Sequence, residues 1–79
     1  MADAIVRLVA QTLNIDPALI SDESSPENTQ GWDSLASLNL ITAIEEAFSV
    51  ELSLPEMMAM HDVGLVRAVL LRKGVVING

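Results

Sequence analysis

The 79-residue sequence contains no cysteine. This absence excludes a disulfide framework, a thiolate nucleophile and any zinc site with sulfur ligands. Aromatic side chains are scarce, with one tryptophan, one phenylalanine and no tyrosine, and only four basic residues stand against eleven acidic ones. Nucleic-acid binding needs clustered basic residues and often stacking aromatics, so nucleic acid is a poor partner for a net charge of -7. A protein partner with a basic surface is the better expectation.

Long apolar runs are also missing. No stretch approaches the roughly 20 apolar residues that cross a bilayer, and the segment 1–7 carries the acidic Asp3 where a signal peptide has basic residues. We therefore expect a cytoplasmic protein without a membrane span. The length predicts one domain, 1–79, with an ordered core from about residue 3 to 74. The apolar half of the sequence must then be used in packed helices.

The periodicity of the apolar residues predicts an all-α fold, a small four-helix bundle with three main helices and a short third one. A first amphipathic helix is expected over about residues 3–14, with Ala10 largely off its apolar face. Asp16 and Pro17 predict a capped short turn through Ile20. Residues 21–31 have no apolar side chain and predict a long solvated loop. The expected apolar face of the first helix is Ile5, Leu8, Val9, Thr12 and Leu13.

The second helix is expected from Asp33 or Ser34 to about Phe48, because this stretch has good helix formers and neither glycine nor proline. Its apolar residues occupy more than one face. A ridge of Leu35, Leu38 and Thr42 continues to Glu45 and suits a docking surface, so some apolar surface should stay exposed. The stripe suited to the core is Leu40, Ile41, Ile44, Ala47 and Phe48.

Two further helices are predicted near the end of the chain. Pro55 opens a short helical turn that reaches about Met60, in which Met57, Met58 and Met60 are expected to fill space. Asp62 is the expected cap of a last helix, and Gly74 the residue just after its end. That helix should present Val63, Val66, Val69 and Leu70 on neighbouring turns, with Arg72 and Lys73 near its end.

Ser34 is the residue whose setting points to chemistry. It stands at the start of the second helix, where unpaired backbone N–H groups and the positive end of the helix dipole favour a phosphate ester. A helix-cap role alone is the alternative for this serine. The stretch Asp33-Ser34-Leu35, followed by Leu38, the pair Glu45-Glu46 and Phe48, resembles the acyl carrier protein family, and the resemblance covers nearly the whole chain.

The resemblance implies a carrier that catalyses nothing itself. Ser34 would receive 4'-phosphopantetheine from coenzyme A by a separate, magnesium-dependent phosphopantetheinyl transferase, and the thiol of this arm would hold an acyl group as a thioester. Asp33 would assist transferase recognition or cap the helix. Partner recognition by enzymes with basic docking surfaces would fall to Leu35, Leu38, Glu45 and Glu46. The expected protein is a free-standing acyl carrier protein and a monomer.

Three positions depart from the pattern of fatty-acid-synthesis carriers. Ala36 and Asn39 stand where those proteins usually have acids, and Thr42 where they tend to have a larger apolar residue. The departures favour a specialised pathway, namely polyketide, nonribosomal peptide or modified-lipid synthesis. An aminoacyl or peptidyl carrier remains an alternative. An unmodified helical interaction module with the carrier fold is another.

The remaining candidate residues have structural interpretations. His61 is the only histidine, and we expect it at the surface rather than paired with Ser34, because a serine hydrolase needs a strand-to-helix elbow that this helical pattern lacks. No metal site is expected, since the segment 22–27 lacks the alternating oxygen ligands and central glycine of a calcium loop. Trp32 is expected to anchor the long loop against the bundle.

Overall fold

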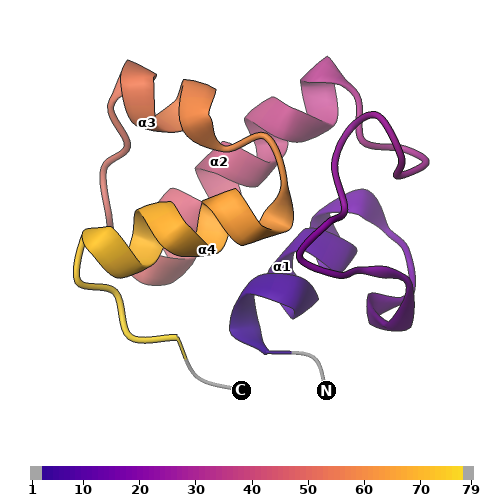
Figure 1. The fold of residues 1–79 in the computed structure, drawn as a ribbon, viewed down its shortest axis with the longest axis horizontal. Coiled ribbons are helices and arrows are strands. Elements are labelled where there is room, and N and C mark those ends of the chain that lie inside the picture. The colour runs from indigo at the N-terminus through magenta and orange to yellow at the C-terminus, as the bar shows by residue number, and fades with distance from the viewer. Residues whose placement is uncertain (1–2, 78–79) are drawn as a thin grey trace.

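The structure, a computed structural model, describes residues 3–77, and these form four α-helices and one 3-10 turn without any strand (Figure 1). The all-α prediction with a short third helix is confirmed. Met1 and Ala2, on which part of the signal-peptide argument rests, lie outside the described residues. The elements in chain order are α1 (Ala4–Leu13), η1 (Pro17–Leu19), α2 (Ser34–Phe48), α3 (Leu54–Ala59) and α4 (Val63–Arg72).

Local sequence signals set the helix ends. Each helix is preceded by a side chain that accepts a hydrogen bond from a backbone N–H of the first turn, an arrangement that stabilises a helix by about 1 kcal/mol. α4 closes with Gly74 at φ 85, while the N–H groups of Gly74 and Val75 donate to Leu71 and Leu70 at 3.0 Å, so glycine is required at this turn. The predicted caps Asp16, Asp33 and Asp62 are confirmed, and Asp3 and Ser53 complete the set.

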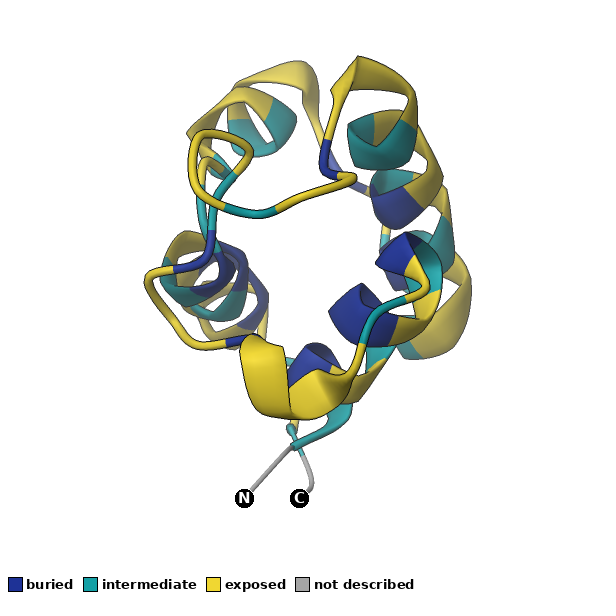
Figure 2. Cartoon of the chain, turned by 90° about the vertical axis from the view of Figure 1, so that its right-hand side faces the viewer, coloured by how far each residue is buried: buried dark blue, intermediate teal, exposed yellow. Residues whose placement is uncertain are grey.

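One hydrophobic core joins the helices. In Figure 2 the buried segments of the helices face the interior and the exposed ones face outward. The predicted inner face of α4 is confirmed in full, and Leu40 and Ile44 of α2 are buried with it. Among the side chains with less than 2% of their surface exposed, the largest are those of Ile5, Val9, Ile44, Val63, Val66 and Leu70.

Three expected side-chain positions were wrong. Ala10 is 1% exposed, because η1 and α4 both contact α1 and widen its buried face. Ala47 is exposed, since it lies at the edge of α2 beside an open groove that Leu8 and Gln11 of α1 also line. Met58 is 65% exposed, because α3 has only six residues and buries none of them completely, leaving its outer face to solvent.

The long loop before α2 is not solvated throughout, as its composition had predicted. Ser24 is 6% exposed, its hydroxyl accepts from the Ser21 N–H at 2.9 Å, and its carbonyl accepts from the Val63 N–H at 3.0 Å. The Asp22 carbonyl accepts from the Gly64 N–H at 2.9 Å. The first part of the loop is therefore attached to the N-terminal turn of α4.

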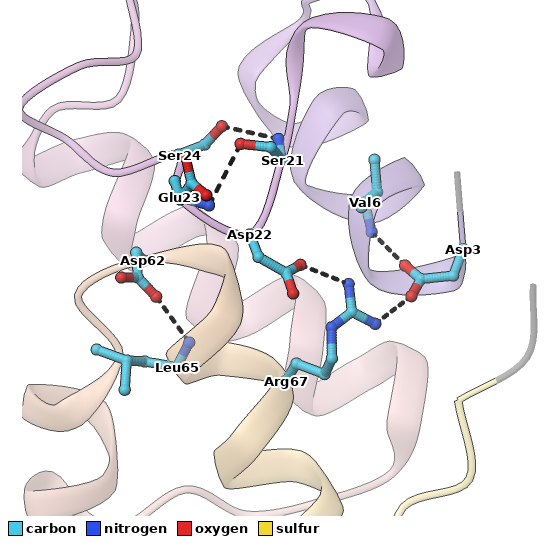
Figure 3. Close-up of polar contacts among 9 residues, drawn as sticks. All are labelled: Asp3, Val6, Ser21, Asp22, Glu23, Ser24, Asp62, Leu65 and Arg67. Atoms are coloured by element: carbon cyan, nitrogen blue, oxygen red, sulfur yellow. Dashed lines mark hydrogen bonds and ion pairs between the residues drawn. The ribbon is translucent and has the colours of Figure 1, made fainter. Parts of the chain in front are cut away.

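Arg67 reinforces this attachment from the middle of α4 (Figure 3). Its guanidinium donates to the Asp22 carboxylate at 3.0 Å and also to the carboxylate of Asp3, the cap of α1. Partial burial raises the pKa of Asp3, but the hydrogen bonds from Arg67 and the Val6 N–H and the Arg67 charge outweigh it and hold that pKa below 3.8. One cation thus joins the start of α1, the loop and α4.

Candidate functional site

Ser34 is the first residue of α2 and is exposed to solvent. The preceding residue, Asp33, adopts an extended conformation and its carboxylate accepts from the Ala36 N–H at 2.8 Å. No hydrogen bond to the Ser34 hydroxyl occurs within residues 3–77. The cap is therefore Asp33, and the hydroxyl beside it is left unengaged for chemistry.

The surroundings of Ser34 fit a phosphate ester. The N–H groups of Ser34 and Leu35 belong to the first turn and have no acceptor within the helix. They point toward the positive end of the dipole of a 15-residue helix, which favours a phosphodiester anion there. Phosphopantetheine attached to this hydroxyl would meet donors and open solvent, so the residues present fit the group.

The segment just before Ser34 is fixed by a tight turn and by a hydrogen bond to α2. Gly31, at φ 86, and the bond from the Trp32 N–H to the Thr29 carbonyl at 3.2 Å form a tight turn that brings Trp32 into the core, where it is 4% exposed. The indole N–H donates to the Ser37 hydroxyl at 3.0 Å. The predicted anchoring role of Trp32 is confirmed, and Ser37 was not recognised from the sequence as its partner.

A surface of α2 beside Ser34 is uncharged, and two exposed leucines make part of it apolar. Leu35 is 67% exposed and Leu38 is 63% exposed, which confirms that the α2 ridge leaves apolar surface outside the core. Asn39 and Thr42 are exposed next to them, at the three- and four-residue spacing that places side chains on one helix face. We call Leu35, Leu38, Asn39 and Thr42 the docking face of α2.

The two predicted recognition acids have different surroundings. Glu45 is half-buried, and its carboxylate accepts from the Leu52 N–H at 2.9 Å, which fixes the connection between α2 and α3. Glu46 is exposed, and no hydrogen bond or ion pair of its side chain occurs within residues 3–77. The sequence offered no signal for the structural use of Glu45, because its partner is a backbone group in a connecting segment seven residues away.

The other polar residues do not assemble into a catalytic or metal site. His61 is exposed immediately before Asp62, the cap of α4, as predicted. Within the described part of the chain, residues 3–77, no three His, Asp or Glu side chains gather closely enough to hold a metal ion. None of the helices described is both long and apolar enough to cross a membrane.

The sequence matches the model of the phosphopantetheine attachment site over residues 3–68. The fold is similar to the solution NMR structure of a holo acyl carrier protein from Geobacter metallireducens, with a TM-score of 0.70 and 27% identity, covering 89% of this chain and 85% of that one. The chain belongs to the phosphopantetheine attachment site family and is a carrier domain of the acyl carrier protein type. It is a carrier rather than an enzyme, and its cofactor is covalently attached 4'-phosphopantetheine.

Proposed function

We propose that Ser34 is the attachment residue and that the chain carries acyl intermediates as thioesters. The observation that supports this most directly is an exposed, unengaged hydroxyl at the first position of α2 in a member of a phosphopantetheine-attachment family. When bound, the arm supplies a terminal thiol, which this cysteine-free chain lacks. A thioester is activated for acyl transfer, and a tethered substrate reaches successive enzymes at raised effective concentration.

The attachment step uses the Ser34 oxygen as the nucleophile. A phosphopantetheinyl transferase holding a magnesium ion directs this oxygen to the pantetheine-bearing phosphorus of coenzyme A. A serine O–P bond forms, the P–O bond of the pyrophosphate breaks, and adenosine 3',5'-bisphosphate leaves, while the hydroxyl proton passes to a base of the transferase. Asp33 holds the first turn of α2 in place through its bond to the Ala36 N–H.

Partner enzymes are proposed to bind the docking face of α2, with Leu35 and Leu38 as the apolar contacts nearest to the attachment residue. Glu46 supplies negative charge on the same helix for steering toward basic surfaces. Asp33 and Glu45 also remain predicted recognition residues, although the carboxylate of each is already hydrogen-bonded within the chain. Their recognition role is therefore expected to be smaller than that of Glu46.

The cargo is proposed to belong to a specialised pathway: polyketide, nonribosomal peptide or modified-lipid synthesis. Exposed Asn39 and Thr42 support this, because they make the docking face uncharged where fatty-acid-synthesis carriers usually present an acid and a larger apolar side chain. A monomer in the cytoplasm, as predicted from the sequence, suits this shuttle role. Loading by acyl-transferring or by adenylating enzymes distinguishes an acyl carrier from an aminoacyl or peptidyl carrier.

The deciding experiment is intact mass spectrometry after incubation with coenzyme A, magnesium and a broad-specificity phosphopantetheinyl transferase. We expect the parent to gain one phosphopantetheine on the peptide that contains Ser34, and Ser34→Ala to gain none. Ser34→Ala should fold normally, since its hydroxyl has no partner within residues 3–77, and far-UV circular dichroism checks this. No gain with several transferases would instead favour an unmodified interaction module.

A further inference from the structure

A cavity of about 450 Å³ lies beside η1, between the end of α1 and the long loop, and the docking face of α2 contributes nothing to it. Its size is within the range of about 300 to 1,000 Å³ that small-molecule sites occupy. Half-buried Ile15 and exposed Leu19 give it an apolar side. Leu19 is 71% exposed, so a large apolar side chain lines this cavity without being covered by the chain itself.

The polar side of the cavity has groups that the fold does not use. Ser24 and Asn28 are occupied by hydrogen bonds that hold the loop together. The Gln30 amide and the Glu23 carboxylate also line the cavity, and neither side chain makes a hydrogen bond within residues 3–77. An amide and a carboxylate beside apolar side chains suit a neutral ligand that has its own amide groups. The Glu23 charge disfavours an anionic ligand.

The cavity lies within reach of Ser34. The turn closed by the Trp32 N–H and the Thr29 carbonyl brings the Cα atoms of these residues within about 7 Å of each other. Two further residues add at most about 7 Å, so Thr29, which lines the cavity, lies within about 14 Å of Ser34. From phosphorus to sulfur, phosphopantetheine spans about thirteen bonds, roughly 16 Å when extended.

The C-terminal end of α1 lies close to both the cavity and the segment that leads to Ser34. A Cβ atom built on Gly31 would lie 3.9 Å from the Leu13 carbonyl, so the residue three positions before Ser34 packs against the C-terminal end of α1. Ile15 follows Leu13 by two residues and forms the apolar side of the cavity. Thr29 and Gln30 are thus a short stretch of chain from the attachment residue, and the Ile15 side is near it through the packing of Gly31 on Leu13.

From this arrangement we propose that the cavity is a resting site for the pantetheine section of the arm, a proposal that rests on Ser34 being the attachment residue. The pantetheine section is neutral, and toward its thiol two amide groups alternate with apolar methylene segments, so it matches Gln30, Glu23, Leu19 and Ile15 in chemistry. Its phosphate stays at the N-terminus of α2, away from Glu23. Because the arm is tethered, contacts too weak to bind free pantetheine are sufficient to hold it.

The test uses the holo protein labelled with ¹³C and ¹⁵N and carrying an unlabelled arm. Intact mass first verifies that one phosphopantetheine is attached. Isotope-filtered NOE spectra then detect protein protons near the arm. We expect cross-peaks from the methylene protons next to the arm's thiol to the methyl groups of Leu19 and Ile15, and apo-to-holo amide shifts at Thr29 and Gln30.

Two variants keep the test specific. Leu19→Ala should lose the cross-peaks and the Gln30 amide shift while still accepting the arm. Leu71→Ala, which shortens another exposed leucine outside the cavity, should keep both. A verified holo protein whose shifts stay within residues 33–37, with no cross-peaks to Ile15 or Leu19, would overturn the resting site and leave the carrier function intact. Failure of the mass gain would overturn both.

Discussion

The backbone N–H of Gly64 donates to the Asp22 carbonyl at 2.9 Å, and a Cβ atom on residue 64 would lie 3.2 Å from that same oxygen. Glycine in the first turn of α4 therefore permits the loop to approach the helix backbone closely. The bond from the Val63 N–H to Ser24 holds the loop at this distance. The position of the loop that leads to Ser34 thus depends on residue 64 of α4 being a glycine, which has no side chain.

Gly64→Ala should destabilise the protein by about 1 kcal/mol, although alanine normally favours a helix over glycine by a similar amount. The added methyl group must push back a backbone oxygen that is hydrogen-bonded to the mutated residue itself. Thermal unfolding would measure this as a decrease of roughly 4 to 8 °C in Tm. The control Ala68→Gly, at an exposed position of the same helix, measures the difference in helix propensity between alanine and glycine without any contact with the loop. A higher Tm for Gly64→Ala would show that the loop moves away freely.

Arg67→Met should lower the free energy of unfolding by about 0.5 to 1 kcal/mol, because it removes a partly exposed bridge between Asp3 and Asp22 while keeping the apolar stem. The folded-state pKa of Asp3 lies below its ordinary value of 3.8, so its charge stabilises the fold above pH 3.8. That stabilisation is lost as the pH falls through the lowered folded-state pKa. Urea unfolding at several pH values should show the parent and the variant converging only as the pH falls below 3.8.

Ser37→Ala should destabilise the protein by about 1 to 2 kcal/mol, because the Trp32 indole N–H would be left without its acceptor in a site that is only 4% exposed. Trp32 is the single tryptophan of the chain, so unfolding followed by its fluorescence reports directly on this site. Ser37→Thr retains the hydroxyl and should recover most of the stability. An unchanged midpoint for Ser37→Ala would show that another acceptor or water replaces the serine.

The parts of the fold that the sequence predicted depend on neighbours in the chain. The cap Asp62, the proline after Asp16 and Gly74 after α4 act within one turn, and each was found where its local pattern predicts it. The position of Ser34 at the start of α2 follows from the same local logic. Helix ends and the candidate attachment residue could therefore be predicted from the sequence.

What the sequence did not reveal depends on residues far apart in it. The loop was predicted to be solvated because its composition is polar, but it is attached to the backbone of Val63 and Gly64, and Arg67, 45 positions after Asp22, reinforces this attachment. Ala47 was placed in the core by periodicity, yet its exposure depends on how α1 packs against α2. The sequence pattern identifies a face of a helix but does not show how far the neighbouring element covers it.

Glu45 and Glu46, adjacent at the end of α2, allow a role in stability and a role in partner recognition to be tested separately. Glu45→Ala removes the acceptor of the Leu52 N–H and should destabilise the fold by about 1 to 2 kcal/mol, seen as a lower Tm. Glu46→Lys changes only an exposed side chain, so its Tm should stay within about 2 °C of the parent. It should nevertheless lower kcat/KM for a basic partner enzyme several-fold at low salt, and the loss should shrink as salt screens the charge. A salt-independent loss, or a large loss of Tm in Glu46→Lys, would contradict steering by Glu46.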